Sequence, residues 1–67
     1  MYEAGKKIRV RHGIYPCMDD PFLELHVKNQ TELEIIADIE EEKKVVVNAS
    51  KNKQPVRIVI PYYQIAA

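Results

Sequence analysis

The sequence predicts a small all-β protein, and two observations support this prediction. Apolar and polar residues alternate with a period of two in several separate segments, which is typical of strands with one buried face. Residues that favour turns, chiefly Pro and Asn, lie between these segments. We therefore expect a small antiparallel five-stranded meander or an SH3/Sm-like barrel.

The alternation places the expected strands at residues 7–12, 22–28, 32–40, 43–49 and 55–61. A loop that contains Pro16 and Pro21 separates the first two strands, and Pro61 leads into a short terminal strand, Tyr62–Ala66. Residues 32–44 are also rich in helix formers, so a helix is the alternative for that segment. We favour a strand because its apolar residues alternate.

Adjacent strands are expected to pair their apolar residues on the same face of the sheet. This rule pairs Val27 with Leu33 in the first hairpin and Ile39 with Val45 in the second. In the last hairpin it pairs Val47 with Ile58 across a loop of residues 51–54. The registers together describe a meander.

The length of 67 residues permits one domain, residues 1–67. A domain of this size buries only about 60% of the surface of its unfolded chain, so its stability is marginal. With a single Cys there is no internal disulfide. Oligomerisation is then the common remaining source of buried surface.

Several apolar residues are candidates for an oligomer interface. Ile36, Val46 and Val59 interrupt the alternation and would lie on the face of the sheet opposite the core. Such residues are exposed, buried by a fold-back of the chain, or buried by another subunit. We expect a homo-oligomer joined through sheet edges and these side chains, with the interface residues Ile36, Val46, Val59, Tyr63 and Ile65.

Charge is segregated along the chain although the net charge is +0. Residues 1–16 have four bases and one acid (net +3), residues 17–42 have one base and nine acids (net −8), and residues 43–67 have five bases (net +5). A neutral total therefore does not exclude a basic surface. The alternative is that these cations are simply solvated.

Two basic clusters and one aromatic residue form the candidate nucleic-acid site. Cations on alternate positions of a strand can follow a phosphate backbone, and an exposed tyrosine can stack on a base. The candidate residues are Lys7, Arg9, Arg11, Lys51, Lys53, Arg57 and Tyr62.

Two segments resemble the Sm-like family. Residues 25–33 (LHVKNQTEL) resemble the first Sm hairpin, and residues 56–65 (VRIVIPYYQI) resemble the second Sm segment, in which a strand meets a short turn and a final edge strand. The similarity covers residues 22–67. It implies an SH3-like barrel of the Sm-like type, rings built by pairing of edge strands, and RNA binding. It does not supply the family's RNA-pocket residues, because the loop after the bent strand is Glu41-Glu42-Lys43.

Catalytic, metal and cofactor sites are not expected. The only glycines, Gly5 and Gly13, cannot form a Gly-rich phosphate loop. The spacing of the metal-ligand residue types matches no structural zinc pattern; these residues are His12, Cys17, Asp19, Asp20 and His26.

The first residues are charged and show no secretory signal, and the apolar runs are too short to span a membrane. A single Cys17 suits a reducing compartment, so we expect a cytoplasmic protein. The function that these observations favour is a non-enzymatic Sm-like oligomer that binds RNA or single-stranded DNA. The alternative is a protein–protein interaction or structural assembly module that binds no nucleic acid.

Overall fold

The computed structural model describes residues 2–66, which form two antiparallel sheets and contain no α-helix. The larger sheet has five strands in the order β6-β5-β4-β1-β7, and the smaller sheet pairs β2 with β3. The strands are β1 (Lys7–Val10), β2 (Gly13–Pro16), β3 (Glu24–Val27), β4 (Thr31–Ile39), β5 (Lys44–Lys51), β6 (Gln54–Pro61) and β7 (Ile65–Ala66). Two short 3₁₀ turns are η1 (Glu40–Glu42) and η2 (Tyr62–Gln64). The prediction of an all-β protein is confirmed.

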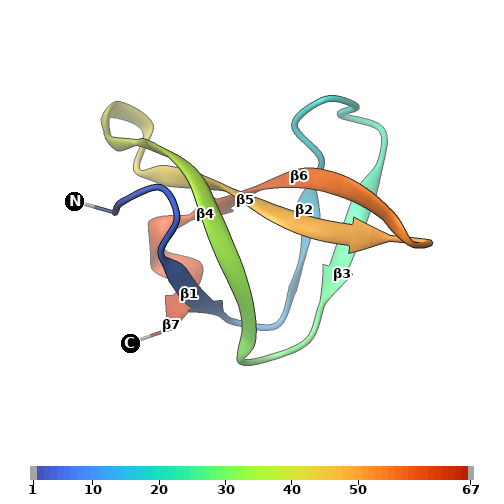
Figure 1. Cartoon of the computed structure of the whole chain (residues 1–67), viewed down its shortest axis with the longest axis horizontal. Coiled ribbons are helices and arrows are strands. Elements are labelled where there is room, and N and C mark those ends of the chain that lie inside the picture. The colour runs from blue at the N-terminus through green and yellow to red at the C-terminus, as the bar shows by residue number, and fades with distance from the viewer. Residues whose placement is uncertain (1, 67) are drawn as a thin grey trace.

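The larger sheet combines a meander with a return of the chain to its first strand (Figure 1). Strands β4, β5 and β6 follow one another as antiparallel neighbours. The turn η2 then directs β7 back to β1, which also pairs with β4. This arrangement is compatible with an SH3-like barrel.

The β2–β3 hairpin covers one face of the five-stranded sheet. Beyond β2 the chain reaches the edge strand β6, where Cys17 and Ile58 form an isolated bridge. The backbone N–H of Met18 also donates to the carbonyl oxygen of Arg57 at 2.7 Å. These contacts attach the hairpin to the sheet edge, so that apolar residues of both sheets share one core.

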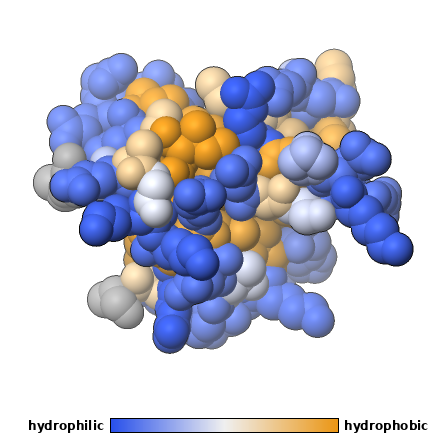
Figure 2. Space-filling model, viewed as in Figure 1, coloured by the Kyte–Doolittle hydropathy of each residue, from blue (hydrophilic) through white to orange (hydrophobic). Residues whose placement is uncertain are grey.

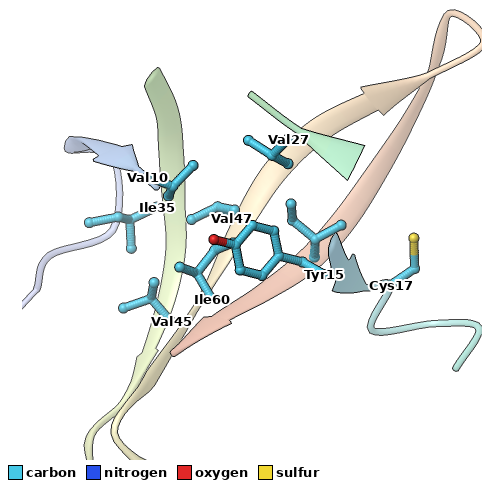
Figure 3. Packing of buried hydrophobic residues seen from close by; sticks show 9 residues of the cluster. Val10, Tyr15, Cys17, Val27, Ile35, Val45, Val47 and Ile60 are labelled. Atoms are coloured by element: carbon cyan, nitrogen blue, oxygen red, sulfur yellow. The ribbon is translucent and has the colours of Figure 1, made fainter. Parts of the chain in front are cut away.

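The core lies between the hairpin and the sheet (Figure 3). The ring of Tyr15 points from β2 into the middle of this cluster, and its hydroxyl donates to the carbonyl oxygen of Arg11 at 2.7 Å. That bond satisfies the polar group of a side chain that is only 3% exposed. The buried cluster consists of Val10, Tyr15, Cys17, Val27, Ile35, Val45, Val47, Ile58 and Ile60.

The first predicted hairpin is wrong. Residues 13–16 fall between the expected strands 7–12 and 22–28 and were predicted to belong to the connecting loop, but they form β2 and pair with β3. Val27 therefore pairs with Gly13, and Leu33 pairs with Ile8. The apolar pattern fixes which face of a strand is buried, but it does not identify the partner strand.

The second predicted register is shifted by one residue. The pairing of β4 with β5 is irregular between Ile35 and Ala37, which leaves Ile36 as the extra residue of a bulge. After the bulge, Val45 pairs with Asp38 instead of the predicted Ile39. The bulge therefore places Asp38 on the same face as the buried Val45.

The last predicted hairpin is confirmed, including the pairing of Val47 with Ile58. Its loop is shorter than predicted, because Lys51 pairs with Gln54 and leaves only Asn52 and Lys53 in the turn. Both turn residues have positive φ angles, 52° and 64°. This is the conformation of a two-residue type I′ turn, which suits the twist of paired strands.

Candidate nucleic-acid interface

A shallow groove of about 600 Å³ lies along the exposed edge of β1, next to β7. Strand β7 pairs only with Arg9 and Val10, so it does not cover the beginning of β1. The groove is thus formed where a short edge strand ends. It is lined by Tyr2, Lys7, Ile8, Arg9, Arg11, Ile65 and Ala66.

The groove brings together the first predicted basic cluster, Lys7, Arg9 and Arg11. Among residues 2–66, Arg9 and Arg11 form no ion pair. The Nζ atom of Lys7 lies 3.9 Å from a carboxylate oxygen of Glu32, and both side chains are more than half exposed. Such an exposed pair contributes about 0–1 kcal/mol, so it leaves Lys7 free to exchange partners.

Acidic residues of β4 partly offset the positive charge beside the groove. In the register of β1 with β4, Arg9 lies opposite Glu32 and Lys7 lies opposite Glu34. The predicted basic strip is therefore not a uniformly positive face. Arg11 follows the end of β1, where its backbone N–H donates to Gln64 at 2.8 Å, and it faces no acid in this register.

The second predicted basic cluster lies elsewhere. Lys51, Lys53 and Arg57 belong to the β5–β6 hairpin, and β4 and β5 separate β6 from β1. Arg57 forms a two-pronged ion pair with Asp19 (Nη2–Oδ1 2.8 Å and Nε–Oδ2 3.2 Å). The Nζ atom of Lys51 donates to the carbonyl oxygen of Glu24 at 2.9 Å. Two of these three cations therefore have partners within the chain, and the two clusters do not form one surface.

Tyr62, the predicted stacking residue, is half-buried and makes contacts within the chain. Its ring lies 4.9 Å from the ring of Tyr2, measured between centroids, and its hydroxyl donates to Asp38. Burial raises the pKa of Tyr62, and the hydrogen bond to Asp38 raises it further. The same hydrogen bond is the main reason that the pKa of Asp38 is lowered.

Tyr2 is the aromatic residue that lines the groove, and it is not among the residues predicted to bind nucleic acid. The only signal in the sequence was its position a few residues before the basic strip. Its backbone N–H donates to Asp38 at 3.0 Å, and this bond holds the N-terminal segment against β4.

The structure separates the candidate interface residues by exposure. Val46 pairs with Val59, as follows from the predicted pairing of Val47 with Ile58, but Val46 is only 2% exposed within the single chain. Ile36 and Val59 are half-buried, and Ile65 lines the groove. Tyr63 is 78% exposed. In the view of Figure 2, apolar surface remains visible between hydrophilic side chains in the middle of the face.

The β2–β3 hairpin carries exposed apolar residues that are not among the predicted interface residues. Ile14 and Met18 are more than half exposed, and Phe22 is 94% exposed. The loop that presents Phe22 is ordered by hydrogen bonds: the N–H groups of Phe22 and Leu23 donate to the side chain and the carbonyl oxygen of Asp20. Phe22 is therefore held in solvent by the turn.

Comparison with known proteins gives no match to a family model, to a curated protein or to a solved structure. Within residues 2–66, no helix has the length and apolar character needed to cross a membrane. The described residues also contain no group of three or more His, Cys, Asp or Glu side chains that could hold a metal ion. Cys17 is buried and unpaired.

Proposed function

We propose that the protein is a non-enzymatic barrel of the Sm-like type that binds RNA or single-stranded DNA along the groove beside β1. The observation that supports this proposal is that Lys7, Arg9 and Arg11 line one groove together with Tyr2. Alternate residues of a strand are about 6.6 Å apart, so these cations are arranged in a row. A flexible single strand can follow such a row, with a base against an aromatic ring.

The expected binding is weak and sensitive to salt. Three cations neutralise at most about three phosphates, which gives a slope of log affinity against log salt of about −2 for a single strand. A tenfold rise in salt should then weaken binding about 100-fold. The acids opposite Lys7 and Arg9 should lower the affinity further.

The experiment is a titration of a fluorescent oligouridine with the protein at several salt concentrations. An Arg9→Gln, Arg11→Gln double variant should bind at least about tenfold more weakly at low salt, with a slope reduced by about 1.4, since two phosphate contacts are lost. Both side chains are exposed, so the fold should be retained.

The matched control is a Lys28→Gln, Lys53→Gln double variant, which removes the same charge from exposed positions outside the groove. It should bind like the unmodified protein. An equal loss of affinity in both double variants would show only a general effect of charge and would contradict binding along the groove. Absence of binding by the unmodified protein at low salt would contradict nucleic-acid binding altogether.

A second candidate function is a protein-interaction module, including assembly with further copies of itself. The observation that favours it is the ordered display of Phe22, together with Met18 and Ile14, on the β2–β3 hairpin. Exposed apolar residues that gather on one element often mark an interaction surface. In this candidate function, the interface between protein chains lies on the β2–β3 hairpin. It does not include Val46, which is buried within its own chain.

A further inference from the structure

Two histidines that are far apart in the sequence meet on the surface of the β2–β3 hairpin. The Nε2 atoms of His12 and His26 lie 3.2 Å apart. Their ring centroids are 5.2 Å apart, with an angle of 52° between the ring planes. Both side chains are exposed to solvent, so an ion could reach the two nitrogens directly.

The register of the hairpin explains why the two rings meet. Gly13 pairs with Val27 and Ile14 pairs with His26, so His12, directly before β2, is a diagonal neighbour of His26. Diagonal neighbours on one face of an antiparallel pair are within reach of aromatic side chains. Tyr15 and Val27 are buried on the core face, and the two histidines therefore share the opposite, solvent-facing side.

The backbone beside His12 is fixed from the core. The hydroxyl of Tyr15 donates to the carbonyl oxygen of Arg11, the residue before His12, at 2.7 Å. Gly13, the residue after His12, lies close to that hydroxyl, and a Cβ atom added there would be only 2.9 Å from it. The position of His12 is thus set by a buried side chain, which limits the freedom of the pair.

We propose that His12 and His26 bind one divalent transition-metal ion of the kind that prefers imidazole, such as Zn²⁺, through their Nε2 atoms. Zinc–nitrogen bonds are about 2.0–2.1 Å long. Two nitrogens on one tetrahedral ion are then about 3.3–3.4 Å apart, as follows from those bond lengths. The separation of 3.2 Å needs only a small adjustment to meet this geometry.

The proposed site is open. Among residues 2–66, no third His, Cys, Asp or Glu completes a group of ligands, so water would fill the remaining positions. Lys28 lies opposite His12 if the register of the hairpin is extended by one residue, and its charge lowers the affinity for a cation. We therefore expect weak binding, with a dissociation constant in the micromolar to submillimolar range.

Metal binding changes the protonation of the pair in a simple way. Without metal, the short separation is that of a hydrogen bond in which one Nε2 carries the proton and the other accepts it. With metal, both Nε2 lone pairs are donated to the ion, and each ring carries its proton on Nδ1. No oxidant or further reactant is required. Neither histidine lines the groove beside β1, so this inference is independent of the proposed function.

The test is a Zn²⁺ titration of the full chain near neutral to slightly alkaline pH, because imidazole binds a metal ion in its deprotonated form. Binding is followed by calorimetry and by the ¹⁵N resonances of the histidine rings. We expect one ion per chain, with the Nε2 resonances of both histidines shifted. His12→Gln and His26→Gln should each weaken binding at least tenfold, while Lys28→Gln, which removes the nearby positive charge and no ligand atom, should bind the ion at least as tightly as the unmodified protein.

Three results would overturn the proposal. The first is no shift of either Nε2 resonance at millimolar Zn²⁺. The second is unchanged affinity in either histidine variant, with circular dichroism showing that the variant is folded. The third is one ion per two chains with a doubled mass, which would mean that a second copy completes the ligand set and that no open site exists on the single chain.

Discussion

Asp38 shows how one backbone irregularity decides the environment of a side chain. The bulge at Ile36 reverses the alternation of β4, so that Asp38 lies on the same face as the buried Val45. There its carboxylate accepts hydrogen bonds from the hydroxyl of Tyr62 and from the backbone N–H of Tyr2. The carboxylate thus connects the N-terminal segment, β4 and the turn η2.

This contact predicts that stability depends on pH at both extremes. The pKa of Asp38 is lowered, chiefly by the hydrogen bond from Tyr62. The contribution of Asp38 to the free energy of unfolding is therefore present above the ordinary carboxyl pKa and is lost as the pH falls. The pKa of Tyr62 is raised, by burial and then by Asp38. The contribution of Tyr62 to the free energy of unfolding is therefore present below the ordinary tyrosine pKa of about 10 and is lost as the pH rises.

A Tyr62→Phe variant should therefore show a smaller loss of melting temperature than the unmodified protein at both acidic and alkaline pH. Tyr63→Phe is the matched control, because Tyr63 follows it directly and is 78% exposed. Thermal melts across the pH range would measure both profiles. If the two variants gave the same profile, the contact between Tyr62 and Asp38 would not contribute to stability.

At the scale of single residues, the sequence indicated the groove in part. Period-two alternation placed Lys7 and Arg9 on one face of a strand, and the structure brings them into one groove with Arg11. Tyr2 could not be found in this way, because its position depends on Asp38. The pairing of His12 with His26 depends on β2, a strand that the alternation of apolar residues did not predict.

At the scale of elements, the β5–β6 hairpin contains a locally unfavourable residue. Asn52 and Lys53 form its two-residue turn with positive φ angles. Asn tolerates this conformation, whereas Gly is strongly preferred over Lys at the second position of such a turn. The rest of the hairpin has eight consecutive residue pairs, so the strands impose the conformation on Lys53.

Lys53→Gly should stabilise the protein by about 0.5–1 kcal/mol, since glycine adopts the left-handed conformation without steric cost. Urea unfolding followed by circular dichroism would measure the change. The matched control is Lys7→Gly in strand β1, where the φ angle is not positive and glycine should destabilise the strand. If the Lys53→Gly variant were no more stable than the unmodified protein, the positive φ angle of Lys53 would not reduce the stability of the hairpin.

At the scale of the whole molecule, 67 residues provide a small core. Domains of this size have a low free energy of unfolding, and burial of apolar surface between copies would raise it. Phe22 and Met18 are exposed on an ordered loop, whereas Val46, one of the predicted interface residues, is buried.

We expect the native protein at high micromolar concentration to have a mass above the 7.8 kDa of one chain. A Met18→Ser, Phe22→Ser double variant should return to that mass, because it removes the exposed apolar side chains. Val59→Thr, on the half-buried outer face of β6, should not change the mass. Light scattering would measure all three. A native monomer would contradict self-association. Loss of the oligomer only in Val59→Thr would show that the interface lies on the five-stranded sheet and not on the β2–β3 hairpin.

By itself, the sequence determined the all-β class, the approximate position of most strands and the register of the β5–β6 hairpin. These features depend on alternation and on neighbours in the chain, and local pairing with a short turn leaves few alternatives. The tertiary structure decided the rest: β1 pairs with β4 across an inserted hairpin, and a bulge moves Asp38 to the core side. Several partner strands and registers can bury the same apolar faces, and only packing of the whole chain selects among them.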